Sequence, residues 1–249
     1  MASRVVNWFK LSSPATFYPA ARRIGQVSTV IAVVLIVVGL YISFFVAPSD
    51  YKQGEGYRII YVHVPASWMS MFIYLVMAGW AAIGLIFNTR LSAMMAQSLA
   101  PTGAMFAFLS LWTGAFWGKP MWGTWWVWDA RITSELILLF LYLGYMALRS
   151  SIDDQRRADR ASGILLLVGV VNIPIIYYSV QWWNTLHQGA TIRLNEESTM
   201  DDTMFLAMMI MTFGFWAYSI AVAMSRVRSI ILERERSTSW VQQLVSGER

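Results

Sequence analysis

The chain has 249 residues, of which 57% are hydrophobic and 13% are charged, and its mean hydropathy is +0.50. These values exclude an ordinary water-soluble domain and place the chain among integral membrane proteins. The absence of cysteine excludes disulfides, thiolate metal sites and thioether attachment of a cofactor. The net charge of +5 does not indicate nucleic-acid binding, because the basic residues cluster in short segments between apolar runs.

Uncharged runs long enough to cross a bilayer recur along the chain. The first run would be about 35 Å long as a helix, too long for a signal-peptide core, so we expect a retained anchor. Only thirteen uncharged residues separate Glu135 from Arg149, so the fourth span must begin earlier and bring Glu135 to the membrane boundary. The prediction is an all-α membrane protein, one domain over 1–249, with six spans at about 24–46, 64–87, 92–117, 132–148, 161–183 and 203–225.

The distribution of lysine and arginine predicts which side each loop faces. Fourteen of the 19 basic residues lie in the two tails and in the second and fourth loops. The remaining five lie in the other loops, 47–63, 118–131 and 184–202. Since short cytoplasmic loops carry the positive excess, we predict that both termini are cytoplasmic and that these three loops face outward.

The chain has only two histidines, His63 and His187, and both fall at the outward membrane boundary of this topology. Because residues before proline favour extended geometry, we expect the second span to begin at Pro65 and to leave His63 just outside it. An ordinary interfacial role is the alternative for each histidine. Their common position beside aromatic residues favours joint ligation of haem iron, whereas zinc would need additional carboxylate ligands.

Residues 117–129 read WGKPMWGTWWVWD and hold five tryptophans within twelve residues. An aromatic belt at the membrane interface accounts for Trp8, Trp68 and Trp216, but a belt needs only one or two rings at a helix end. Five rings between glycines and a proline indicate a large apolar surface for a flat ring such as haem.

Two conformations of this segment remain open from the sequence. A helix would place Trp122, Trp125, Trp126 and Asp129 on one face, because they follow the spacing i, i+3, i+4 and i+7. An extended segment would instead place Trp126 and Trp128 on a common face.

Charged residues flank the tryptophan segment and the first histidine. Arg58 and Arg131 have the guanidinium geometry that pairs with a carboxylate such as a haem propionate, although topology or lipid headgroups also explain them. Asp129 and Glu135 are expected to orient Arg131 or to cap the following helix. The sequence shows no nucleophile constellation and no phosphate loop, so we do not expect an enzyme.

The tryptophan segment, YRIIYVHVP around His63 and WWNTLHQG around His187 together resemble the cytochrome c maturation protein C family of bacterial inner-membrane haem-handling proteins. The resemblance extends over nearly the whole chain, and the WGTWWVWD core is specific to tryptophan-rich haem-handling proteins. It implies that His63 and His187 are axial ligands of a non-covalent b-type haem on the periplasmic face. The platform it implies consists of Trp117, Trp122, Trp125, Trp126, Trp128 and Asp129.

The resemblance also implies partners. A protein of this family passes haem to a periplasmic haem chaperone, which binds it covalently through its own histidine before delivery to apocytochrome c. The family works with an ATP-binding-cassette ATPase, a membrane permease subunit and a small single-span subunit.

Two other functions compete with haem transfer. An electron-transfer cytochrome b with two haems would need four ligands buried within helices, whereas this chain has two at one rim. A haem or solute permease would need polar residues near the middle of the membrane, and Asn172 and Pro174 are the only indication of these. A helix kink is sufficient to explain Pro174.

Overall fold

The computed structural model describes residues 12–183, 185, 187 and 200–247, and helices make up most of these residues. The predicted all-α architecture is confirmed, because six helical segments are long and apolar enough to cross a membrane. The elements are α1 (Pro14–Tyr41), the π-helical turn η2 (Ile42–Val46), the 3₁₀ turn η3 (Glu55–Ile59), α2 (Ile60–Phe87), α3 (Arg90–Trp122), α4 (Ala130–Ser150), α5 (Gln155–Gly169), α6 (Asn172–Trp182), α7 (Asp202–Arg234) and α8 (Ser239–Ser246).

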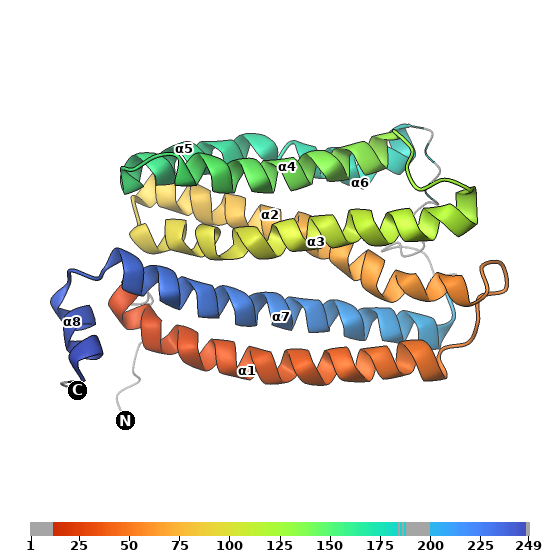
Figure 1. The fold of residues 1–249 in the computed structure, drawn as a ribbon, viewed down its shortest axis with the longest axis horizontal. Helices are drawn as coiled ribbons and strands as arrows, with labels where there is room; N and C mark the ends of the chain where they lie inside the picture. Colours follow the sequence, from red (N-terminus) through yellow and green to blue (C-terminus); the bar gives the residue numbers. More distant parts are fainter. Residues whose placement is uncertain (1–11, 184, 186, 188–199, 248–249) are drawn as a thin grey trace, which may run out of the picture.

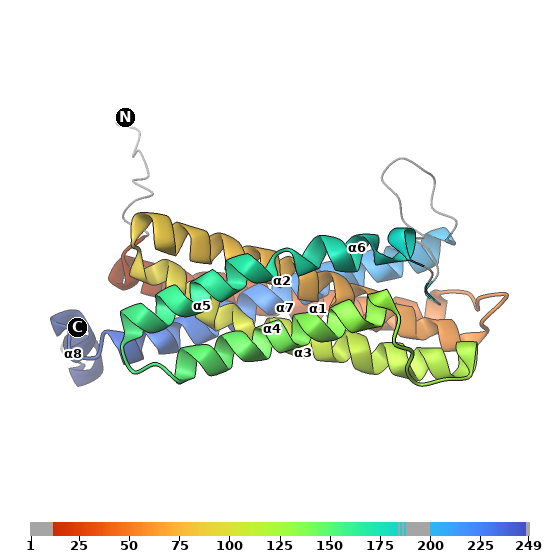
Figure 2. The same cartoon turned by 90° about the horizontal axis from the view of Figure 1, so that it is seen from above.

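The spans form one bundle of roughly parallel and antiparallel helices (Figure 1). The helices α2 and α3 lie at its centre and pack against α7 on one side and against α4 and α5 on the other. The helix α1 packs along α7, and α6 continues the span of α5 beside α4. Figure 2 shows that α5 and α6 run one after the other along the bundle.

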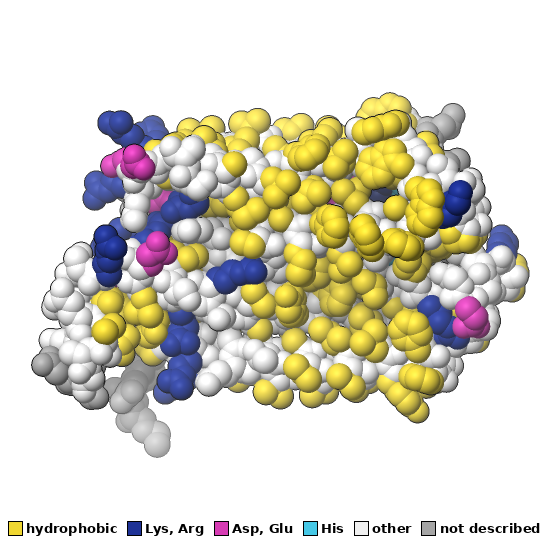
Figure 3. Space-filling model, viewed as in Figure 1, with side chains coloured by type: hydrophobic (Ala, Val, Ile, Leu, Met, Phe, Trp, Pro, Cys, Tyr) yellow, Lys and Arg dark blue, Asp and Glu magenta, His cyan; other side chains and the backbone are white. Residues whose placement is uncertain are grey.

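Basic side chains gather at one end of the bundle, where α1 and α3 begin and α2, α4 and α7 end (Figure 3). We call this the arginine end; its basic residues are Arg22, Arg23, Arg90, Arg149, Arg156, Arg157, Arg160, Arg226, Arg228, Arg234 and Arg236. The opposite end holds Lys52, Arg58, Lys119 and Arg131. Some residues of the sequence analysis lie outside the described residues. They are the basic residues Arg4, Lys10, Arg193 and Arg249, the tryptophan Trp8 and most of the loop 184–202.

Several helices are longer than the apolar runs that predicted them. The first begins at Pro14 rather than residue 24, the third ends at Trp122 rather than residue 117, and the last continues to Arg234 rather than residue 225. Hydropathy marks only the part of a helix that matches the hydrocarbon core, and charged residues can extend that helix beyond the core. The fourth span begins at Ala130, ahead of Glu135 as predicted, and buries Glu135.

The prediction that α2 begins at Pro65 is wrong. The helix begins at Ile60, directly after η3, so His63 lies within its first turn. Pro65 is the sixth residue of α2 and removes one helix hydrogen bond, to the Tyr61 carbonyl. Tyr61 is fully buried and its hydroxyl lies 2.9 Å from that of Tyr57, which anchors this turn.

The fifth span, predicted as one helix over 161–183, is interrupted between α5 and α6. Pro174 has no N–H for the Val170 carbonyl, which accepts instead from the Ile173 N–H at 3.0 Å. The Asn172 amide donates to the Ser134 carbonyl of α4 at 2.9 Å. Asn172 and Pro174 therefore belong to a kink in this span, as the sequence suggested for Pro174.

Candidate functional site

His63 and His187, 124 positions apart in the sequence, line one cavity at the end of the bundle opposite the arginine end. We call it the histidine cavity. Its walls come from α2, α3, α4 and the two segments that follow α3 and α6. The residues that line it include His63, Ser110, Gly114, Trp125, Trp126, Arg131, Glu135 and His187.

His63 is held by α3 through its Nδ1 atom, which lies 3.0 Å from the Thr113 hydroxyl. That hydroxyl has a single proton and donates it to the Leu109 carbonyl at 2.6 Å. The Thr113 oxygen must therefore accept a hydrogen bond from Nδ1–H of His63. This tautomer leaves the Nε2 lone pair available to a metal, the arrangement seen in most metal-binding histidines.

His187 is oriented by a carboxylate. Its Nδ1 atom lies 3.4 Å from Oδ2 of Asp129, a long hydrogen bond. The other oxygen of Asp129 accepts from the Ile132 N–H at 2.8 Å, so Asp129 also caps α4, as predicted. Burial lowers the pKa of His187, against the opposing effect of Asp129, so the imidazole is neutral near pH 7 and can bind iron.

The tryptophan segment is divided by Gly123, whose φ of +77° ends α3 in the left-handed conformation. A helical face from Trp122 to Asp129 is therefore wrong. The indoles of Trp126 and Trp128 pack at 5.4 Å, as the extended alternative predicted. Trp125 packs edge-on against Phe116 of α3 and is 52% exposed.

Four of the five tryptophans adjoin a histidine or the histidine cavity. Trp117 packs edge-on against His63 at 5.6 Å, and Trp122 lies 5.3 Å from the ring of His187. Trp125 and Trp126 line the cavity. Trp128 does not line it and is exposed.

The two arginines have different surroundings. Arg131 lines the histidine cavity and donates through Nη1 to the Ile176 carbonyl of α6 at 2.7 Å. Arg58 does not line the cavity. It pairs with Glu55 and donates to the carbonyls of Ser43 in η2 and of Ala47 directly after η2.

Glu135 forms part of the cavity wall without pairing to Arg131. It is buried, and its Oε1 accepts from the Ser70 hydroxyl of α2 at 2.8 Å. Among the described residues, no three side chains of the types His, Cys, Asp and Glu come together, so the zinc alternative has no ligand set there.

The family profile described as Heme exporter protein C matches residues 7–242. The chain belongs to the Heme exporter protein C family. Heme exporter protein C of Escherichia coli strain K12 is 51% identical over 214 residues, or 86% of each chain. Heme exporter protein C of Haemophilus influenzae is 43% identical over 233 residues, which cover 94% of this chain and 95% of the relative.

A mitochondrial protein of Marchantia polymorpha, named ccmC-like in cytochrome c biosynthesis, is 46% identical over 207 residues, which cover 83% of this chain and 86% of the relative. These comparisons confirm the resemblance to the cytochrome c maturation protein C family that the motifs predicted. This member of the Heme exporter protein C family is a multi-pass membrane protein.

Sequence reasoning about this family member missed three residues of α3 that shape the histidine cavity, Ser110, Thr113 and Gly114. A Cβ at Gly114 would lie 3.0 Å from Cε1 of His63, so glycine permits the close approach of the ring. The spacing along α3 could have indicated Thr113. It precedes Trp117 by one helical turn, so both side chains lie on the same helix face and contact His63.

We expect Thr113→Val to weaken haem binding about tenfold, because it removes the acceptor that fixes the His63 tautomer while keeping the side-chain shape. Absorbance titration of the detergent-purified protein with haem measures this loss. Thr212→Val is the matched control, since Thr212 is equally buried and donates to the Met208 carbonyl of its own helix. Equal haem affinity in the two variants would remove the orienting role of Thr113.

Proposed function

We propose that this chain binds haem between His63 and His187 and passes it to a periplasmic haem chaperone during c-type cytochrome biogenesis. The observation that carries the proposal is the pair of imidazoles on one cavity, each with Nδ1 engaged. Two such imidazoles supply the donor set of a bis-histidine b-type haem. The names of the relatives, which refer to haem export and to cytochrome c biosynthesis, support the same function.

The surrounding residues suit a large anionic ring. Trp117 and Trp122 fix the two imidazoles, and Trp125, Trp126 and Trp128 supply the apolar platform, with Asp129 orienting His187. The buried indole N–H of Trp126 has no partner among the described residues. We propose Arg131 as the partner of a propionate, since it lines the cavity and only one of its donors is bonded in the described part of the chain.

The histidine cavity is narrow in this structure. The space between its side chains is about 30 Å³, enough for water but far below the roughly 300–1,000 Å³ of ligand pockets. Trp125 and His187 lie on connecting segments rather than in helices. We propose that these two side chains move apart when haem binds, so that an edge of the ring stays accessible for transfer.

The proposed setting is the bacterial inner membrane. On the positive-inside rule, we propose that the arginine end lies in the cytoplasm and that the histidine cavity lies at the periplasmic face. The proposed partners are an ATP-binding-cassette ATPase, a membrane permease subunit and a small single-span subunit. Any ATP hydrolysis belongs to that ATPase, and the chain itself handles haem without catalysing a reaction.

His187→Ala tests the transfer step. In membranes that contain the complete maturation complex, we expect the variant to load the periplasmic chaperone with covalent haem at least tenfold less than the unaltered chain, because one ligand is lost. Haem staining of the chaperone on denaturing gels measures this yield. Gln242→Ala, on the exposed surface of α8, is the control. Normal loading by His187→Ala would contradict the proposal.

A further inference from the structure

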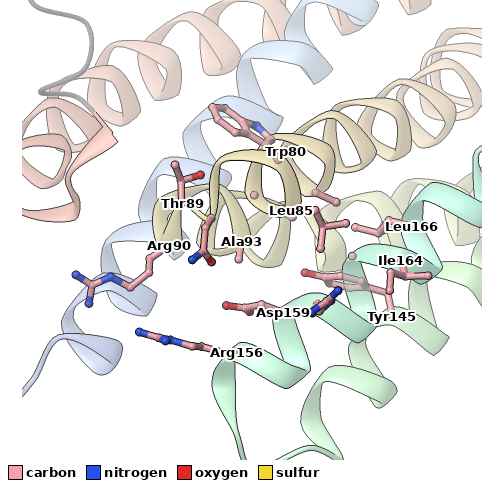
Figure 4. A pocket seen from close by; sticks show the side chains of 16 residues that line it. Trp80, Leu85, Thr89, Arg90, Ala93, Tyr145, Arg156, Asp159, Ile164 and Leu166 are labelled. Carbon is pink, nitrogen blue, oxygen red and sulfur yellow. The ribbon is translucent and has the colours of Figure 1, made fainter.

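A second and larger cavity lies at the arginine end, between α2, the start of α3 and α5 (Figure 4). We call it the arginine-end cavity; its volume is about 820 Å³. It shares no lining residue with the histidine cavity. The haem function proposed above does not use it.

The arginine-end cavity is amphipathic. Figure 4 shows the guanidinium groups of Arg90 and Arg156 on one side and the side chains of Leu85, Ile164 and Leu166 on the other. Arg160 also lines it. A ligand that fills this space therefore needs an anionic group at one end and an apolar body at the other.

The basic side of the cavity keeps an excess of positive charge. Asp159, the one carboxylate in its lining, already pairs with Arg149 and with Arg234, the latter at 3.0 Å. Arg156 and Arg160 form no ion pair within the described part of the chain.

The other acidic residues near the arginine-end cavity do not cancel its excess positive charge. Arg90 lies 3.5 Å from Glu235, but its side chain is 71% exposed, so water screens this pair. Asp154, two residues before Arg156, is the N-cap of α5, and its side chain accepts from the Arg157 N–H. An anion could therefore bind the guanidinium groups without displacing the ion pairs of Asp159.

The apolar side is continuous with the lipid-facing surface. Ile164 and Val168 of α5 are 50% and 67% exposed, and Ile86 of α2 is also exposed. No histidine, methionine or cysteine lines the cavity, so it lacks the usual axial ligands of haem. Basic pockets between membrane helices on the cytoplasmic side characteristically hold acidic phospholipid headgroups.

We infer that the arginine-end cavity binds an anionic phospholipid of the adjacent leaflet. Its phosphate contacts Arg90, Arg156 and Arg160, and its acyl chains lie along Leu85 and Ile164. The bound lipid ties α5 to the α2–α3 turn, because the guanidinium groups come from both elements.

The test compares phosphatidylglycerol with phosphatidylcholine, added to the delipidated full-length protein and followed by native mass spectrometry. We expect phosphatidylglycerol to bind more tightly and the Arg156→Gln/Arg160→Gln variant to bind it about 25-fold less tightly, from about fivefold for each arginine. The matched control is Arg22→Gln/Arg157→Gln, which removes two exposed charges outside the cavity. Equal binding of the two lipids, or equal losses in the two variants, would overturn the inference.

A second variant tests the cavity itself without changing charge. Ala93 lines the wall, and Ala93→Trp fills the space. We expect this variant to lose most phosphatidylglycerol binding while keeping haem binding at the opposite end, which verifies its fold. Undiminished lipid binding by a haem-binding Ala93→Trp protein would show that the lipid sits elsewhere and would contradict the inference.

Discussion

Gly103→Ala is expected to destabilise the bundle by about 3 kcal/mol, as overpacking of a close helix contact does. A Cβ on Gly103 of α3 would lie 2.2 Å from ring atoms of Tyr142 on α4. Tyr142 cannot retreat, because it is fully buried, donates to the Ser70 carbonyl at 2.6 Å and packs edge-on against Tyr74. The methyl group must therefore push α3 away from α4, about two helical turns from Ser110 and Glu135 of the histidine cavity.

The midpoint of thermal unfolding in detergent, followed by circular dichroism, measures this loss. Gly79→Ala is the control, because a Cβ at Gly79 meets no atom within 4 Å and alanine favours the helix. A double variant, Gly103→Ala with Tyr142→Ala, removes the clashing ring and should lose less than the sum of the two single losses. If the stability loss of the double variant equalled the sum of the two single losses, the steric explanation would be wrong.

Asp129→Ala is expected to lower haem affinity about a hundredfold, the upper end of losses for residues that orient a metal-binding histidine. Asp129 has two roles, since one oxygen caps α4 through Ile132 and the other orients His187. Loss of the cap alone costs about 1 kcal/mol of stability. Haem titration and thermal unfolding, measured on the same preparation, separate the two effects.

The variant Asp129→Asn separates the capping of α4 from the orientation of His187. Asparagine caps helices about as well as aspartate, so the stability of this variant should stay close to that of the unaltered chain. Its amide lacks the charge that stabilises the imidazole of His187, so haem affinity should still fall, by about tenfold. Full haem affinity in Asp129→Asn would mean that Asp129 serves only as a cap.

The sequence predicted the membrane class, the number of spans and the common end of the two histidines, because length, hydropathy and charge asymmetry act over whole segments. Asp129 as a helix cap followed from its position before an apolar run. These features depend on local composition rather than on the packing of particular side chains.

Other features depended on contacts between distant segments. The helix start at Ile60 rests on the buried Tyr57 and Tyr61, which outweigh the local preference at Pro65. The bond from His63 to Thr113 joins residues 50 positions apart. The conformation of the tryptophan segment depended on Gly123, and both the helical and the extended alternatives were open until its φ was known.

The arginine-end cavity was also hidden in the sequence, where its arginines served only to predict topology. Arg90 begins α3 and Arg156 lies in the first turn of α5. Both guanidinium groups stay available because Asp159 pairs with Arg234 instead. A count of lysines and arginines in each loop includes these residues but does not show that they line a cavity.

The most direct test of the haem site is the visible absorption spectrum of the detergent-purified protein, oxidised and reduced, beside His63→Ala and His187→Ala. The account predicts a low-spin b-type spectrum for the unaltered chain, and a weakened or high-spin spectrum for each variant, because each removes one iron ligand. A low-spin spectrum unchanged in both variants, or no haem in a chain produced with ample haem supply, would contradict it.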